Sequence, residues 1–188
     1  MLKCTAVLAA LALAGPGFAQ TLTLTPADPQ PSAGDLAPGL AVSYAYHSVR
    51  TLQEANGKLG RAKPGPALPG LSYLDSDPGE MALTSDSAEK VVAAIKGYIK
   101  FEAAGTFDVD FISNDGILAH IGGQQVALLD GVHGCESAGV QSVEVPQAGW
   151  YEVEATYFQR KGSACLMMDW SVPGDLEPVP DAAFAHRK

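Results

Sequence analysis

The residues best suited to binding chemistry are Asn114 and Asp115, which stand side by side in the stretch Ser113-Asn114-Asp115-Gly116. Carboxylate and amide carbonyl oxygens are ligands that hard cations such as Ca²⁺ accept, and they also accept hydrogen bonds from sugar hydroxyls. Asn, Asp and Gly are also turn residues that tolerate positive φ. We therefore expect a turn that presents a cation or sugar site, and the alternative is a plain strand-ending turn.

A strand is predicted on each side of this turn. Apolar and polar residues alternate through Thr106–Ser113, which is the pattern of a strand with one buried face. Ile117–Ile121 resumes β character, and Gly122-Gly123 permits a tight hairpin into Gln124–Leu129. The turn is therefore expected at the rim of a rigid sheet.

Short apolar strands separated by turn residues recur along the chain. Further strands are predicted at Ala41–Val49, from Val91 onward, and at Val140–Val145, Trp150–Phe158 and Ser163–Trp170. Such regular spacing of strands and turns is typical of sandwiches and barrels. The chain is predicted to be all-β, an antiparallel β-sandwich or barrel with long loops. The Gly- and Pro-rich stretch Gln53–Gly79 is expected to lack regular structure and either to carry function or to pack over the barrel mouth.

The first 19 residues have the layout of a secretory signal peptide. A positive start at Lys3 precedes the apolar run Cys4–Ala14, and small residues precede a cleavage point after Ala19. The run is shorter than the ~20 residues that a membrane span needs. We expect an exported protein, periplasmic or extracellular, without a membrane span.

The mature chain is expected to hold one domain between two loose ends. Residues 20–37 are rich in proline and predicted to be a flexible lead-in, and residues 38–174 are predicted to form the domain. Residues 175–188 carry further prolines and a charged end, and are predicted to be a disordered tail.

The charge balance argues against nucleic acid and anionic lipid as partners. The chain has 12 Lys and Arg against 21 Asp and Glu, a net charge of −9, and loss of Lys3 with the leader makes it −10. Such a chain repels nucleic acid and anionic lipid. Neither is expected as a partner.

Two cysteines, Cys135 and Cys165, remain after the leader. In an oxidising compartment they are expected to form a disulfide, and the alternative is two buried free thiols. Two isolated cysteines offer too few ligands for zinc.

Catalysis is not expected, although Asp115, His133 and Glu136 could in principle form an acid–base set. The sequence has no GxSxG, no HExxH and no nucleotide-binding glycine motif. No cysteine is left free to act as a nucleophile.

The order of several motifs resembles a known family. They are Gly97-Tyr98-Ile99, Ala104–Phe107, Ser113–Gly116, Ile121–Gly123, Ala148–Tyr151, Tyr157-Phe158 and Gly162–Gly174. Together, over Pro38–Gly174, they are similar to the anthrax protective-antigen (PA14) domain, a β-barrel of bacterial glycosidases, toxins and adhesins and of fungal flocculins. The resemblance implies a glycan-binding or adhesion module.

The resemblance also implies a ligand set. In the sugar-binding members, two consecutive aspartates joined by a cis peptide bind calcium, and the calcium ligates sugar hydroxyls. The matching pair here is Asn114 and Asp115, in which one carboxylate is replaced by an amide. An amide carbonyl can still ligate calcium, with one formal charge fewer. The family places the loop Asp130–Ala138 beside the pair, so His133 and Glu136 are candidate sugar contacts.

The predicted function is therefore a non-catalytic, lectin-like module that binds a glycan or cell-envelope polysaccharide, with Ca²⁺ as the possible cofactor. The alternative is a structural or protein–protein interaction module of the cell envelope that keeps the barrel without the sugar site. Both functions are compatible with the same β-barrel, because a fold does not determine a function.

Overall fold

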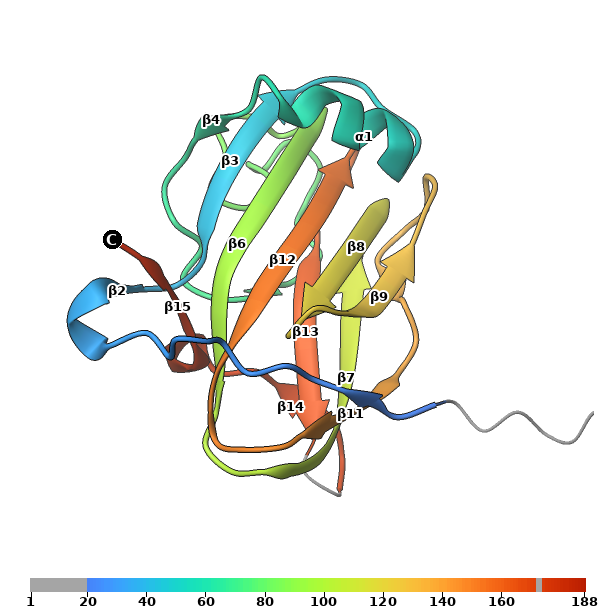
Figure 1. Ribbon diagram of the computed structural model, residues 1–188. Coiled ribbons are helices and arrows are strands. Elements are labelled where there is room, and N and C mark those ends of the chain that lie inside the picture. Colours follow the sequence, from blue (N-terminus) through green and yellow to red (C-terminus); the bar gives the residue numbers. More distant parts are fainter. Residues whose placement is uncertain (1–19, 172–173) are drawn as a thin grey trace, which may run out of the picture.

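The computed structural model describes residues 20–171 and 174–188. Two β-sheets face each other and enclose the hydrophobic core (Figure 1). All strand pairs but one are antiparallel, as expected for an all-β sandwich. The predicted fold class is confirmed. The signal peptide predicted over residues 1–19 lies outside the described residues.

The first sheet, here called the β7 sheet, has the strand order β1-β11-β7-β13-β14. Its strands are β1 (Leu22–Thr23), β11 (Gln141–Val145), β7 (Gly105–Ser113), β13 (Leu166–Ser171) and β14 (Glu177–Pro178), with β10 (Glu136–Ser137) on β7 and β5 (Ser72–Tyr73) on β13. The alternation predicted around Phe107 and Phe111 is confirmed, because both side chains are buried in the core.

The second sheet, here called the β6 sheet, has the strand order β2-β15-β6-β12-β8-β9. Its strands are β2 (Leu36–Pro38), β15 (Phe184–Arg187), β6 (Val91–Phe101), β12 (Gly149–Gln159), β8 (Gly116–Ile121) and β9 (Gln124–Leu129), with β3 (Ala41–Tyr46) on β6 and β4 (Lys63–Pro64) on β3. The long strands β6 and β12 pair over eleven residues each, which gives the sheet its rigid centre.

One α-helix, α1 (Leu52–Leu59), covers one end of the β6 sheet (Figure 1). Thr51 caps it, because its side-chain oxygen accepts a hydrogen bond from the Glu54 N–H at 3.2 Å. Leu52 and Ala55 pack against Val92 and Phe158 on the outer face of the sheet. The expectation that Gln53–Gly79 lacks regular structure was therefore wrong over its first turns. Two 3₁₀ turns, η1 (Ala33–Asp35) and η2 (Asp181–Ala183), complete the elements. No helix of the described residues is long and apolar enough to cross a membrane.

The lead-in of residues 20–37 is ordered, contrary to the prediction. β1 pairs in parallel with β11, and Leu24 is buried in the core. The Gln30 side chain bonds both the backbone N–H and the carbonyl of Trp150. Proline content indicated mobility, but the buried leucine and the amide contacts fix the segment across the barrel.

The tail of residues 175–188 is also structured, again contrary to the prediction. β15 pairs with both β2 and β6 and so fills a place inside the β6 sheet. Phe184 and Val179 are almost fully buried. These apolar residues anchor the segment, and the prolines and charges that suggested disorder lie on its outer side.

Candidate functional site

The turn Ser113–Gly116 crosses from one sheet to the other at one end of the barrel. It joins β7 of the β7 sheet to β8 of the β6 sheet. The predicted turn is therefore present, but its side chains do not face solvent. Asn114 is 3% exposed and Asp115 is 1% exposed.

The Asn114 side chain lies inside the barrel and uses both ends of its amide. Its Oδ1 accepts hydrogen bonds from Tyr157 Oη at 2.7 Å and from the Cys165 N–H at 2.9 Å. Its Nδ2 donates to the Ser163 carbonyl at 2.8 Å. Burial raises the pKa of Tyr157 well above its usual value, and the Asp115 charge adds to the rise, so the phenol keeps its proton and acts as the donor. The amide thus ties the turn to β12 and to the start of β13.

The Asp115 carboxylate binds two backbone N–H groups of neighbouring loops. Oδ2 accepts from Arg160 at 2.6 Å and Oδ1 accepts from His133 at 3.3 Å. The residue has a left-handed φ of 51°, which aspartate tolerates better than most residues. Burial raises the pKa of this carboxyl, and the two backbone hydrogen bonds counteract part of the rise. Asp115 therefore holds the loops that surround it.

The loop 130–138 lies against this turn, includes β10 on β7, and is fixed at three further points. The predicted disulfide Cys135–Cys165 is present, with the Cα atoms 6.0 Å apart. The Asp115 N–H donates to the His133 carbonyl at 3.2 Å. Asp130 Oδ1 accepts from the Leu52 N–H, which joins the loop to the start of α1. A loop fixed in this way is ordered before any ligand arrives.

His133 and Glu136 are brought together on this loop. His133 Nδ1 lies 3.4 Å from Glu136 Oε1 and 2.8 Å from the Gly134 carbonyl. The Glu136 side chain is 58% exposed, whereas that of His133 is 15% exposed and its Nε2 is buried without a partner among the described residues. Glu136 can therefore reach a ligand from its present position, and His133 presents only part of its ring.

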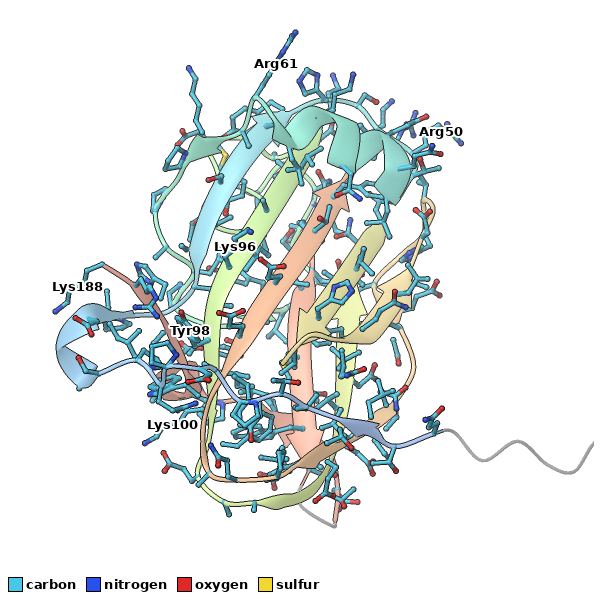
Figure 2. All side chains as sticks on the ribbon, viewed as in Figure 1. Arg50, Arg61, Lys96, Tyr98, Lys100 and Lys188 are labelled. Atoms are coloured by element: carbon cyan, nitrogen blue, oxygen red, sulfur yellow. A yellow bond between two sulfur atoms is a disulfide. The ribbon has the colours of Figure 1, made fainter. Side chains whose placement is uncertain are left out.

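Basic side chains flank the same end of the barrel. Arg50 precedes α1 and Arg61 follows it, and both project outward at that end (Figure 2). Lys96, Tyr98 and Lys100 belong to β6 and lie farther down the β6 sheet (Figure 2). The end that carries loop 130–138 thus also carries two exposed basic side chains, one on each side of α1.

The residues present do not fit a calcium ion at the turn. Each side-chain oxygen of Asn114 and Asp115 accepts a hydrogen bond from a protein O–H or N–H group. Calcium needs six to eight oxygen ligands, and the groups that converge here are hydrogen-bond donors. The Asn114–Asp115 peptide is trans, since the cis bond of the described residues is Asp28–Pro29. The structure therefore supports no calcium-dependent step at this pair.

Sequence reasoning found the turn but missed the residues that hold it. Tyr157, Arg160 and Ser163 supply its partners from 43 to 49 positions farther along the chain. The aromatic strand Trp150–Phe158 indicated burial of Tyr157, but no local signal connected its hydroxyl to Asn114. A buried tyrosine does need a hydrogen-bond acceptor, and a turn amide is a reasonable candidate.

Comparison with known proteins supports the architecture. No protein-family model matches the sequence, and no curated protein sequence is significantly similar to it. Among solved structures, the PA14 domain of the MpAFP antifreeze protein aligns with a TM-score of 0.67 at 15% identity, over 85% of this chain and 96% of that chain. The chain has the PA14 fold.

Two further neighbours with the PA14 fold are a sugar-binding domain and a domain in complex with a disaccharide. The PA14 sugar-binding domain from an RTX adhesin aligns with a TM-score of 0.63 at 15% identity, over 80% of this chain and 99% of that chain. The epithelial adhesin 9 A domain from Candida glabrata, in complex with Galβ1-3GlcNAc, aligns with a TM-score of 0.68 at 13% identity, over 89% and 97%. At these identities the PA14 fold is shared, and ligands have to be argued from this chain's own residues.

Proposed function

We propose that the protein is an exported, non-catalytic carbohydrate-binding module that recognises a glycan at loop 130–138 without calcium. One observation carries the proposal: this loop is fixed by the disulfide, by Asp115 and by α1, yet it leaves polar and apolar groups exposed. A preorganised loop loses less conformational entropy on binding than a mobile one. Two structural neighbours that bind sugars support the same function.

The exposed groups have suitable chemistry for a sugar. The Glu136 carboxylate can accept hydrogen bonds from two sugar hydroxyls. Val132 is 46% exposed in the same loop and can contact the apolar C–H face of a pyranose ring. Asn114 and Asp115 then act as the support of the binding loop, and they do not touch the ligand.

Export is part of the proposal. The disulfide in the structure is typical of proteins that fold outside the cytosol. The leader-like sequence of residues 1–19 agrees with this compartment. A polysaccharide of the cell envelope is then a ligand that the protein would meet.

A glycan array read with and without chelator tests the proposal. The oxidised protein is expected to bind a subset of glycans equally well in both conditions. Glu136→Gln should weaken that binding about tenfold or more, because a hydrogen bond to a charged group contributes about 1.5–3 kcal/mol. Glu152→Gln on the exposed face of β12 is the matched control and should bind as the wild type does. A blank array, or equal binding by Glu136→Gln, would overturn the proposal.

A protein partner in the cell envelope is the second candidate. Leu128 on β9 is 53% exposed and Val140 is 52% exposed, and both border one groove beside β11. Such exposed apolar pairs are more typical of protein contacts than of sugar sites. Loss of envelope association in Leu128→Ser, together with a blank glycan array, would favour this candidate.

A further inference from the structure

Two carboxylates lie side by side on the outer face of the β7 sheet, next to the end of loop 130–138. Asp110 of β7 and Asp169 of β13 are directly opposite in the antiparallel register. Their neighbours Val109, Phe111 and Met168 point into the core, so the two aspartates share the opposite face. Like charges placed directly opposite each other on a sheet destabilise it.

Asp110 has an oxygen without a partner. The residue is only 6% exposed. Its Oδ2 accepts a hydrogen bond from Ser137 Oγ at 2.6 Å, while its Oδ1 is buried and has no hydrogen bond within the described residues. Burying a carboxylate oxygen without a partner is unfavourable. A group from outside the protein chain is therefore expected to bind Asp110 Oδ1.

Asp169 supplies the second half of the site. It is only partly buried, so the pair is open to solvent from its side. Burial, and then the charge of Asp110 directly opposite in the register, raise the pKa of the Asp169 carboxyl. The side chains that flank the pair on the same strands are those of Asp108, Ile112, Met167 and Ser171. None of these carries a positive charge.

No cation of the described chain neutralises the pair. The ion pairs within residues 20–171 and 174–188 are Lys96–Glu154, Lys100–Glu102 and His133–Glu136. Lys96 and Lys100 lie on β6 in the opposite sheet (Figure 2). The acidic pair is therefore without an internal counter-ion.

We propose that Asp110 Oδ1 and the Asp169 carboxylate bind one hard divalent cation, calcium before magnesium. Carboxylate oxygens are the ligands such ions prefer, and a cation would remove both the repulsion and the unpartnered oxygen. Calcium is favoured because it accepts irregular geometry, whereas two side chains fixed on adjacent strands cannot shape a near-ideal octahedron for magnesium. Water completes the coordination.

The site is separate from the turn at Asn114 and does not depend on the proposed glycan function. It adjoins the end of loop 130–138, where β10 pairs with β7 and the Ser137 hydroxyl donates a hydrogen bond to Asp110. With two protein carboxylates, the expected dissociation constant is weak, on the order of 10⁻⁴–10⁻³ M, as in other extracellular modules.

Calorimetric titration of the oxidised protein with CaCl₂, paired with thermal melts in calcium and in chelator, tests the proposal. The wild type should bind one ion and melt at a higher temperature in calcium. Asp169→Asn should lose at least tenfold in affinity and lose the calcium-dependent shift. It should still melt above the wild type in chelator, because the repulsion is gone and the amide can donate to Asp110. A variant that melts above the wild type in chelator is folded, so its loss of calcium binding cannot be a result of unfolding.

Control variants separate the alternatives. Glu144→Gln removes a carboxylate from β11 of the same sheet, where it bonds Thr106, and should bind calcium as the wild type does. The proposal is overturned if the wild type binds no calcium, which is the result expected if a shared proton satisfies the pair. It is equally overturned if Asp169→Asn binds normally, or if binding is lost in a folded Asp115→Asn variant and retained in Asp169→Asn.

Discussion

The hydroxyl of Tyr157 donates a 2.7 Å hydrogen bond to Oδ1 of Asn114 in the interior of the barrel. This contact joins β12 to the turn between the two sheets, and the same oxygen also accepts the Cys165 N–H. The amide of Asn114 is thereby a structural junction between three segments. A carboxylate at this position would place an acceptor oxygen against the Ser163 carbonyl, where the amide Nδ2 now donates a hydrogen bond.

Asn114→Asp is expected to destabilise the protein by about 3 kcal/mol. The new carboxylate would be buried beside Asp115, and one of its oxygens would replace the Nδ2 donor that faces the Ser163 carbonyl. Urea unfolding at neutral pH measures the change. Asn56→Asp on the exposed face of α1 is the control and should cost little. A gain of stability in excess calcium that is larger than the gain of the wild type would contradict the finding that the turn does not fit the ion.

Gly116→Ala is expected to cost about 1–3 kcal/mol or more, because the turn leaves no space for a methyl group. A Cβ at this position would lie 2.2 Å from Cε1 of the Phe158 ring, far inside van der Waals contact. Gly134→Ala is the matched control, since no heavy atom lies within 4 Å of its Cβ. Chemical denaturation of both variants gives the comparison, and equal stabilities would show that Phe158 moves aside freely.

Much of this architecture could be predicted from local patterns, and the site could not. Alternation in β7 and the turn residues of Ser113–Gly116 indicated where the strands and the crossing lie. The inward direction of Asn114 depends on Tyr157 and Ser163, which are distant in sequence, so no short window could show it.

The other features that the sequence-based prediction missed, α1 and the order of both chain ends, have local causes. The helix α1 was missed although Thr51 and Glu54 have the spacing of a capping box. The ends of the chain were judged from proline and charge, whereas single buried residues such as Leu24 and Phe184 decide that they are ordered. Sparse apolar anchors in a polar segment thus carry more structural information than its average composition.

Loss of the disulfide is expected to destabilise the protein and to weaken glycan binding. Cys135 and Cys165 are 30 positions apart, for which the chain-entropy model gives about 3–4 kcal/mol. Cys135→Ser with Cys165→Ser also removes one of the contacts that fix loop 130–138, so ligand binding must then include a larger cost of ordering the loop. Urea unfolding and glycan affinity are measured on the same samples. Unchanged affinity in a folded double variant would show that the loop does not carry the binding surface.

Stability is expected to fall as pH rises through the native pKa of Asp169 when calcium is absent. Burial and the charge of Asp110 raise this pKa above the value of about 3.9 for an unfolded chain. Between the two values the native state binds more protons than the unfolded state, so the free energy of unfolding decreases with increasing pH. The contribution is fully present below the unfolded value and is lost above the native one.

Urea unfolding in chelator, from about pH 3 to about pH 7, measures this contribution as the difference between the wild type and Asp169→Asn. The wild type should lose stability relative to the variant as pH rises, because only the wild type acquires a second charge opposite Asp110. Glu144→Gln should follow the wild-type curve. Calcium should flatten the wild-type curve, since a bound cation stabilises the same ionised pair. A constant difference across the range would mean that Asp169 titrates alike in the folded and unfolded chains.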